Sequence, residues 1–377
     1  MLPVDLVAPA GSSLKQALKD VIYSNPYAHS IFQVCVYCYG FLLGTFQALY
    51  LGPLGAIKRS ADFCAIYAVV ALCYFLYEFP TGRNWRQLTN YFLPREIWSK
   101  RSFRLDIYWT MLTFTPITAL ITKVLASLFF LAYVPTVVNA LSLSNLTSLS
   151  FIRSTLENSA HHDLFVFLIA LISFDFASYW THRFTHTYEF LWQFHKVHHY
   201  SEQLNYFAVE RMHPVDSFLS FSCNNAFMAL VLSIFFPVTD SIFNGAGAFS
   251  STGGVLAMVF IVLNFINRLN HSHFPVSFGS IVNKIVVSPS FHLLHHSKLV
   301  VNKNFGSTLS IWDTLFRTSV LPGQISPEVD HRNFLGVDGM GDDYFENIAQ
   351  WLYKPFVDAF NLVRSKVQKN KAEVNLP

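Results

Sequence analysis

The chain has 377 residues, of which 52% are hydrophobic and only 13% are charged. Soluble globular proteins carry about 25% charged residues, so this composition favours a protein that resides partly in a lipid bilayer. The 26 basic and 23 acidic residues give a formal net charge of +3. This balance argues against a nucleic-acid partner, because such proteins usually carry a strong basic excess.

The amino-terminal segment, residues 1–25, contains several polar and charged side chains. It lacks a short apolar stretch followed by a small-residue cleavage site, so we expect no removable signal peptide. The five cysteines lie in or beside apolar segments. That placement argues against a disulfide framework and favours packing roles.

Six apolar segments dominate the chain, and a helix that crosses a bilayer needs about 20 such residues. The first two are predicted to form a transmembrane hairpin, the last two form a second hairpin, and two prolines interrupt the third segment. These segments predict an all-α fold, an integral-membrane helical bundle, to which the histidine motifs described below add a histidine-rich cytoplasmic di-metal domain. The segments are 31–57, 63–79, 107–141, 164–180, 217–236 and 242–266.

Basic residues predict the topology of this bundle, since Lys and Arg collect in cytoplasmic loops. Six of them lie between Arg83 and Arg104, after the second apolar segment. If the third segment crosses once and the fourth returns, the histidines after Trp180 face the cytoplasm as well. We expect a multi-pass protein of the endoplasmic reticulum in a eukaryote, or of the inner membrane in a bacterium.

Histidines follow these apolar segments in four groups. The first has the spacing H-x-x-x-H, two have the spacing H-x-x-H-H, and the remaining group is a His-Ser-His triplet. Positions i, i+3 and i+4 fall on or near one face of a helix, so each group can aim its imidazoles together. In chain order the groups are His182 and His186; His195, His198 and His199; His271 and His273; and His292, His295 and His296.

A lone histidine is more often a core or capping residue than a ligand, but this recurrence near a membrane indicates metal binding. Neutral imidazole suits Fe, Zn, Cu or Ni. Ten such side chains exceed the needs of one ion, so the pattern predicts two.

The spacing of the histidines and the neighbouring sequence motifs resemble those of the membrane fatty acid hydroxylase / sterol desaturase superfamily. The resemblance covers about residues 163–318 and includes the words Asn304-Phe305-Gly306 and Ile311-Trp312-Asp313. It implies a non-haem centre of two iron ions that activates dioxygen against a lipid C–H bond. The chain departs from the family at Phe316-Arg317-Thr318, where Phe-Gly-Thr is common.

Carried over residue by residue, the resemblance makes the ten histidines of the four groups the candidate iron ligands. Family members often have another residue at the position of His273, so its role as a ligand stays open. His213 has either a ligand role or a hydrogen-bonding role. Asp175, seven residues before His182, is the first candidate for a carboxylate that accepts a hydrogen bond from the ring nitrogen of an imidazole that does not bind the metal. Asp313, Glu210 and Asp216 are further candidates.

The predicted activity is hydroxylation of a sterol, fatty acyl or ether lipid with dioxygen. The same ligands also suit a desaturase, and a non-catalytic membrane metal-binding protein is the alternative of another class. Zinc can occupy such a site in purified protein. The sequence has no His-Pro-Gly-Gly haem-binding motif, so electrons are expected from a separate donor such as cytochrome b5, or ferredoxin with its reductase.

Three regions follow from this reading. Residues 1–162 form an amino-terminal transmembrane region, residues 163–318 form the hydroxylase domain, and residues 319–377 form a carboxy-terminal cytoplasmic tail. Within the tail, an amphipathic helix is predicted over residues 344–366.

Overall fold

The computed structural model describes residues 84–92, 94–113, 162–235, 267–325 and 331–374, with the single positions 72, 75, 76 and 155. All of them belong to one compact unit, Ala61–Pro377. This described part is helical, and its extended pairings are two isolated β-bridges. The all-α class is therefore confirmed for these residues.

The described helices range from four residues in α5 and α13 to 27 residues in α16. In chain order the α-helices are α4 (Trp85–Phe92), α5 (Arg95–Trp98), α6 (Arg101–Thr113), α9 (His162–Thr187), α10 (Glu189–His199), α11 (Pro214–Phe235), α13 (Gly279–Val282), α14 (Pro289–His295), α15 (Ile311–Leu315) and α16 (Ile348–Val374). The 3-10 helices are η3 (Tyr206–Glu210), η4 (Pro322–Gln324) and η5 (His331–Phe334).

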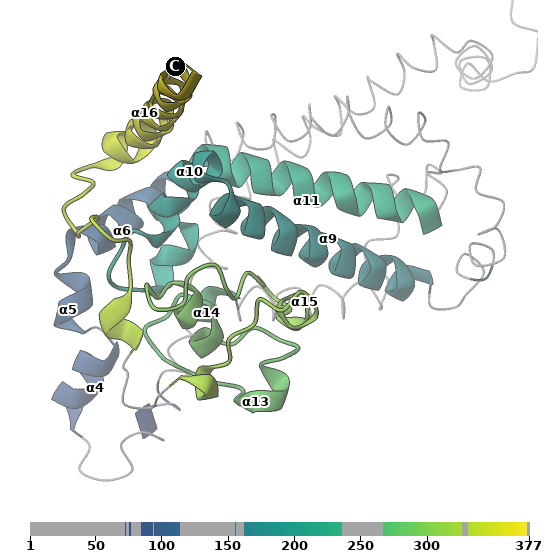
Figure 1. Cartoon of the computed structure of the whole chain (residues 1–377). Helices are drawn as coiled ribbons and strands as arrows, with labels where there is room; N and C mark the ends of the chain where they lie inside the picture. The colour runs from purple at the N-terminus through teal and green to yellow at the C-terminus, as the bar shows by residue number, and fades with distance from the viewer. Residues whose placement is uncertain are drawn as a thin grey trace, which may run out of the picture. The chain divides into compact units, whose positions relative to one another are not determined.

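Helices α9 and α11 lie side by side and form the longest pair of packed helices in the described part (Figure 1). They contain the predicted apolar segments 164–180 and most of 217–236. Among the described residues, no helix has both the length and the apolar character needed to cross a membrane. The predicted segments 31–57 and 242–266, and nearly all of 63–79 and 107–141, lie outside the described residues.

Two local features bring the histidine-bearing helices together. Tyr188 has an extended backbone between α9 and α10, so the chain changes direction immediately after the H-x-x-x-H motif of His182 and His186. Helix α14 begins at Pro289, and the Ser288 side chain caps it by accepting a hydrogen bond from the Phe291 backbone N–H. Proline at the first helical position and serine at the N-cap are both favourable helix starts.

A hydrophobic core joins the carboxy-terminal region to the histidine-bearing helices. Trp351 of α16 and Phe345 are buried together with Val197 of α10 and Trp109 of α6. Burying each such large side chain stabilises the fold by about 1.5–3 kcal/mol. The predicted carboxy-terminal helix is present, although its bounds are Ile348–Val374, and it packs on α10. The three-region division itself stays a prediction.

Candidate metal centre

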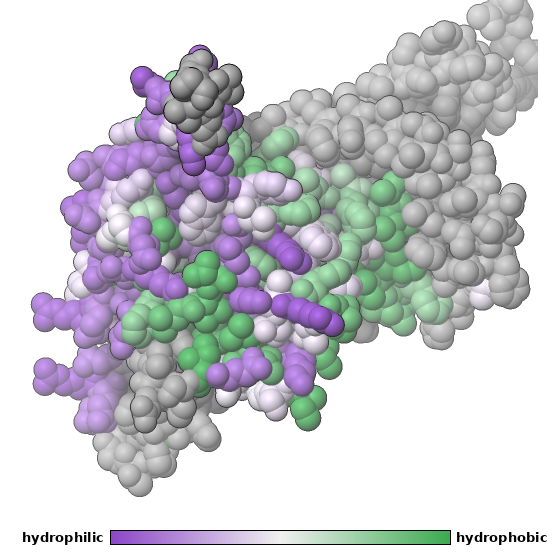
Figure 2. All heavy atoms as spheres, viewed as in Figure 1, coloured by the Kyte–Doolittle hydropathy of each residue, from purple (hydrophilic) through white to green (hydrophobic). Residues whose placement is uncertain are grey.

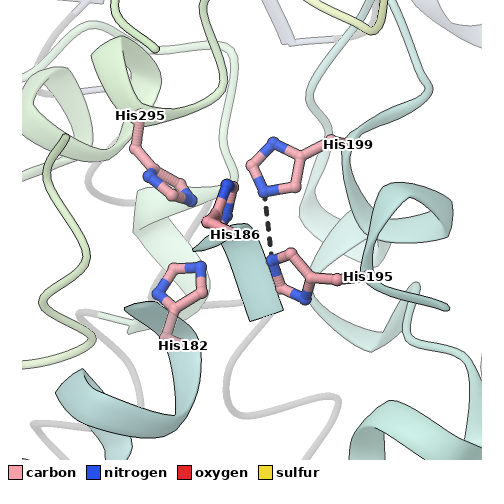
Figure 3. Close-up of side chains that lie close together, drawn as sticks. All are labelled: His182, His186, His195, His199 and His295. Carbon is pink, nitrogen blue, oxygen red and sulfur yellow. Dashed lines mark hydrogen bonds between the residues drawn. The ribbon is translucent and has the colours of Figure 1, made fainter. Parts of the chain in front are cut away.

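Five imidazoles from three helices form what we call the first histidine group (Figure 3). One potential ligand nitrogen from each ring lies within 4.8 Å of every other. Two rings come from α9, two from α10 and one from α14, so this group exists only when the three helices pack together. Its members are His182, His186, His195, His199 and His295.

Four further imidazoles form the second histidine group, and all four are buried. Their nitrogens also lie within 4.8 Å of one another. The Nε2 atoms are in a close series: His198 to His271 at 3.0 Å, His271 to His292 at 3.0 Å, and His292 to His296 at 3.1 Å. The second group therefore joins α10 and α14 with the segment that follows residues 267–270.

The two copies of H-x-x-H-H divide between the groups in a reciprocal way. On α10, His195 and His199 belong to the first group while His198 belongs to the second. In the second copy, His292 of α14 and His296, the residue that caps this helix, belong to the second group, while His295 belongs to the first. On a helix, the i+4 side chain is rotated slightly to one side of position i and the i+3 side chain to the other side, so the two can reach different groups and each motif contributes to both.

Hydrogen bonds behind the rings fix which nitrogen is free to bind a metal. The Nδ1 atoms of His182 and His295 lie 2.7 and 2.8 Å from backbone carbonyls of Phe305 and Lys303. A carbonyl only accepts, so each Nδ1 donates its proton and Nε2 keeps a bare lone pair. The Nε2 atoms of these two rings, and of His186, are buried and lack a partner among the described residues.

A buried carboxylate supports one ring of the first group directly. His195 Nδ1 donates to Asp216 Oδ2 over 2.7 Å, and both side chains are buried. Asp216 lies in the first turn of α11, which explains how it reaches α10 from a different part of the chain. A carboxylate in this position orients an imidazole and raises its basicity toward a metal.

Burial keeps these imidazoles uncharged. Removal from water, reinforced by the neighbouring His195, lowers the pKa of His182 to about 3, and burial lowers the pKa of His271 to about 3. The same cause holds the pKa of His186, His199 and His292 well below the usual value. Neutral imidazole is the form that binds metal ions.

The loop after α14 supplies the carbonyls that hold the first group, and buried aspartates hold this loop. Asp313 accepts from the backbone N–H groups of Phe305 and Gly306 at 2.8 and 2.7 Å. A Cβ on Gly306 would lie 2.6 Å from the Leu309 carbonyl oxygen, so only glycine fits there. The motifs around Asn304 and Asp313 therefore position carbonyls that hydrogen-bond to the candidate ligand rings.

Asp175 acts on the same loop. It accepts from the Thr308 and Leu309 backbone N–H groups at 3.2 and 3.3 Å and from Trp312 Nε1 at 2.8 Å. The carboxylate in direct contact with an imidazole is thus Asp216, whereas Asp175 was the first candidate from sequence. The pairing was hard to foresee because Asp216 and His195 lie on different helices.

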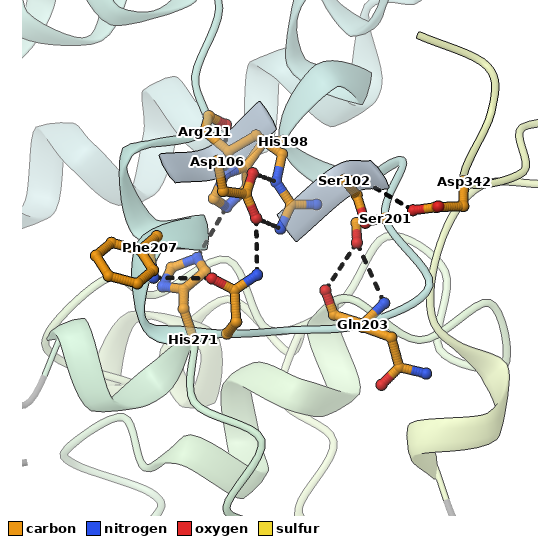
Figure 4. A network of polar contacts seen from close by, with 10 residues as sticks. Ser102, Asp106, His198, Ser201, Gln203, Phe207, Arg211, His271 and Asp342 are labelled. Carbon is orange, nitrogen blue, oxygen red and sulfur yellow. Dashed lines mark hydrogen bonds and ion pairs between the residues drawn. The ribbon is translucent and has the colours of Figure 1, made fainter. Parts of the chain in front are cut away.

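The second group is supported by a buried ion pair (Figure 4). Arg211 Nε and Nη2 donate to Asp106 at 2.8 and 3.1 Å, and Asn205 donates to the same carboxylate at 2.7 Å. The backbone carbonyl of Arg211 accepts from His198 Nδ1 at 3.0 Å. Asp106 lies on α6, so a residue well before the histidine motifs helps to fix a ring of the site.

His273 and His213 lie apart from both groups. His273 Nε2 donates to the Tyr91 carbonyl at 2.8 Å. His213 Nε2 donates to the Leu352 carbonyl at 3.1 Å, while its Nδ1 accepts from the Val215 N–H at 3.1 Å. Both ring nitrogens of His213 are therefore engaged. The structure brings together nine of the ten histidines predicted as ligands.

Glu210, another candidate carboxylate from the sequence, forms an ion pair with Arg268 at 2.7 Å.

The two groups fit metal ions on distance as well as on chemistry. Two nitrogens that bind one ion at about 2.1 Å lie about 3.0 Å apart at a right angle and about 3.4 Å apart at a tetrahedral angle. The close Nε2 pairs of both groups lie 3.0–3.2 Å apart. His198 Nδ1 donates to the Arg211 carbonyl, so His198 Nε2 carries no proton. Without a cation, the single proton of neutral His271 lies either on Nδ1, toward the Asn267 carbonyl at 3.5 Å, or on Nε2, between the Nε2 atoms of His198 and His292. In both cases at least one close nitrogen pair lacks a good hydrogen bond. A metal ion in each group removes this conflict.

Comparison with known proteins agrees with this geometry. Residues 167–318 match the family model described as Fatty acid hydroxylase. The ornithine lipid hydroxylase OlsE of Rhizobium tropici is 30% identical over 156 residues, which are 41% of each protein. Human alkylglycerol monooxygenase is 27% identical over 151 residues, which are 40% of this chain and 29% of the relative.

A third relative, the very-long-chain aldehyde decarbonylase GL1-7 of Oryza sativa subsp. japonica, is 26% identical over 185 residues, or 26% of its length. The matched part of the chain thus spans less than half of each of these relatives. No solved structure matches the chain significantly. The resemblance drawn from the histidine motifs is therefore confirmed for residues 167–318, which match the fatty acid hydroxylase family.

Proposed function

We propose that this protein is a membrane-bound di-iron oxygenase that hydroxylates a lipid with dioxygen. The observation that carries the proposal is the pair of buried imidazole groups, nine rings in all, whose partnerless or mutually facing Nε2 atoms suit two metal ions. The relatives named as a lipid hydroxylase and as an alkylglycerol monooxygenase support a lipid substrate and an oxygen-inserting reaction. The membrane assignment rests on the apolar composition of the chain.

The residues proposed to hold the metals are the members of the two histidine groups. Bound iron supplies the redox chemistry that lets dioxygen attack a saturated carbon. The protein contributes the geometry: Asp216 orients His195, and the carbonyls of the loop after α14 orient two further rings. Burial lowers the pKa of rings such as His182 and His271 and so keeps them neutral. His273 is left out of the proposed ligand set because it lies apart from both groups.

The reaction needs an external reductant. Insertion of one oxygen atom into a lipid C–H bond, with the second atom leaving as water, consumes dioxygen, two electrons and two protons. A one-electron donor protein that acts twice meets this requirement. A metal-dependent hydrolase would need no such partner, so dependence on a reductant separates the two classes.

The test is to incubate the full-length protein, reconstituted with ferrous iron and an electron donor, with lipid extract and labelled dioxygen. We expect about two iron ions per chain and the heavy oxygen in a lipid hydroxyl group. Desaturation would send the label to water instead, and absence of both oxygen uptake and lipid product would contradict the oxygenase. His273→Gln is the matched control, since glutamine can still donate to the Tyr91 carbonyl, and it should keep both metal ions.

A further inference from the structure

One surface of the described part combines exposed apolar side chains with unopposed basic ones, and we call it the basic face. Its most exposed members include Ile281 at 76%, Val301 at 69% and Leu315 at 61%. Figure 2 shows apolar surface over the region of α13, α14 and the following loop, with hydrophilic side chains beside it. The full set is Ile281, Val282, Lys284, Ile285, Leu299, Val301, Lys303, Leu315 and Arg317.

Hydrogen bonds show that these segments are contiguous. Thr314 Oγ1 donates to the Lys284 carbonyl at 3.0 Å, which joins the end of α13 to α15. Lys303 Nζ donates to the Arg317 carbonyl at 3.2 Å, which joins the loop after α14 to the residues after α15. The basic face is therefore one surface built from three segments.

The exposed charged side chains within the three segments of the basic face all have the same sign. Between residues 279 and 321 the charged side chains are Lys284, Lys298, Lys303, Asp313 and Arg317. Asp313 is fully buried, and its carboxylate binds backbone N–H groups of the loop. Lys298 is 3.6 Å from Asp338, which leaves three cations on the basic face itself. A protein with an acidic surface is the complementary partner.

The basic face lies directly over the first histidine group. The carbonyl of Lys303 accepts from His295 Nδ1 at 2.8 Å, and two residues later the carbonyl of Phe305 accepts from His182 Nδ1 at 2.7 Å. Asn302 and Asn304 flank Lys303 with φ of 55° and 59°, a left-handed backbone that asparagine tolerates. Lys303 of the basic face thus contacts one candidate ligand ring through its own carbonyl, and a second ring is contacted two residues further along the chain.

We infer that the basic face is the docking surface of the electron donor, an acidic one-electron carrier protein. The inference rests on the proposed function, which requires two electrons per lipid hydroxylated. Redox partners form small, transient and electrostatically steered complexes, which suits a few cations around a modest apolar patch. A lipid surface is the weaker occupant, because interfacial binding uses a long amphipathic helix and α13 has only four residues.

The experiment measures binding of a soluble acidic carrier to the full-length protein in neutral-lipid nanodiscs. The probes are the haem domain of cytochrome b5 and a ferredoxin, each titrated at low and at raised salt. We expect the double variant Lys284→Glu/Arg317→Glu to weaken binding at least about tenfold and to reduce its salt dependence. The charge-keeping variant Lys284→Arg/Arg317→Lys should bind like the parent protein.

The matched control is Lys369→Glu/Lys371→Glu, which makes the same charge change on exposed positions of α16. It should bind each probe within about twofold of the parent, because the effect depends on place and not on net charge. Equal weakening by the control, unchanged binding by the basic-face variant, or no binding of either carrier to the parent would overturn the inference. Loss of affinity for anionic-lipid nanodiscs alone would identify the surface as a lipid contact and overturn it too.

Failure of this inference can be told apart from failure of the proposed function. The binding assay needs neither turnover nor a lipid substrate. In a separate arm, dithionite reduces the protein without a partner, so the Lys284→Glu/Arg317→Glu variant should still form product in one turnover. Product with dithionite but undiminished carrier binding would remove the docking assignment and leave the oxygenase standing.

Discussion

The two histidine groups differ in how the protein holds them. In the first group, a carboxylate and two backbone carbonyls bind Nδ1 atoms from behind, and several Nε2 atoms are left without a partner. In the second group, the Nε2 atoms contact one another in series, and the support behind His198 is a carbonyl whose residue is fixed by the Asp106–Arg211 ion pair.

Histidines of the same H-x-x-H-H motif can therefore be held in place either by nearby or by distant parts of the chain. The loop that supports the first group belongs to the family-matched segment, as does Asp216. The ion pair that supports the second group depends on α6, which lies outside that segment. We expect the second group to be the more sensitive to changes in the amino-terminal part of the protein.

The largest effect is expected from removing one ring of each group. His199→Ala and His296→Ala change the last histidine of the two H-x-x-H-H copies, so they form a matched pair. Each should lose about one of two metal ions per chain and abolish lipid product, because loss of a ligand costs more than the roughly 10–100-fold of an outer partner. Metal analysis and product assay are the measurements. Full activity of His296→Ala would mean that the second group is not part of the reaction.

The next effect concerns the ion pair under the second group. Asp106→Ala leaves the buried Arg211 charge without its partner, which should lower the free energy of unfolding by about 3–5 kcal/mol. Denaturant unfolding in detergent measures it. Asp338→Ala, which removes a highly exposed partner of Lys298, is the control and should leave the unfolding transition in place. A small change in Asp106→Ala would show that the ion pair does not hold this region.

A more moderate effect is expected at the first group. Asp216→Asn keeps the shape and an acceptor oxygen but removes the negative charge behind His195, so metal affinity should fall about 10–100-fold. Competition with a chelator measures this affinity. Glu210→Gln changes a half-buried surface ion pair and should leave the affinity unchanged. Equal losses in both variants would assign the effect to net charge instead of to the contact with His195.

The smallest effect is expected in the turn that closes the loop behind the first group. Arg317 has φ of 58°, a conformation that costs a non-glycine residue about 1–2 kcal/mol. This is the position where the family often has glycine, so the turn keeps the glycine conformation although the residue differs. Arg317→Gly should therefore raise the unfolding free energy by about 1 kcal/mol, after the entropy that glycine adds to the unfolded chain. Arg317→Ala should bring no such gain, and a gain of equal size there would assign the effect to the lost charge.

From the sequence alone, the helical class of the described residues, the resemblance to the family and ten candidate histidines could be predicted, and the structure brings nine of these ten together. This prediction was possible because helix spacing is local: residues i and i+4 share a face whatever the rest of the chain does. The repeated H-x-x-H-H spacing also predicted more ligands than one ion needs.

The division of the rings into two groups, and the residues that hydrogen-bond to their Nδ1 atoms, follow only from the tertiary structure. Asp216 and Asp106 lie 21 and 92 residues from the imidazoles that they support, directly for His195 and through Arg211 for His198. No periodicity along the chain predicts such pairs, because each pair forms only when helices or loops that are distant in sequence pack together and bury both side chains. For the same reason Asp175, although well spaced on α9, binds the loop after α14, and His273 and His213 bind backbone carbonyls away from the two groups.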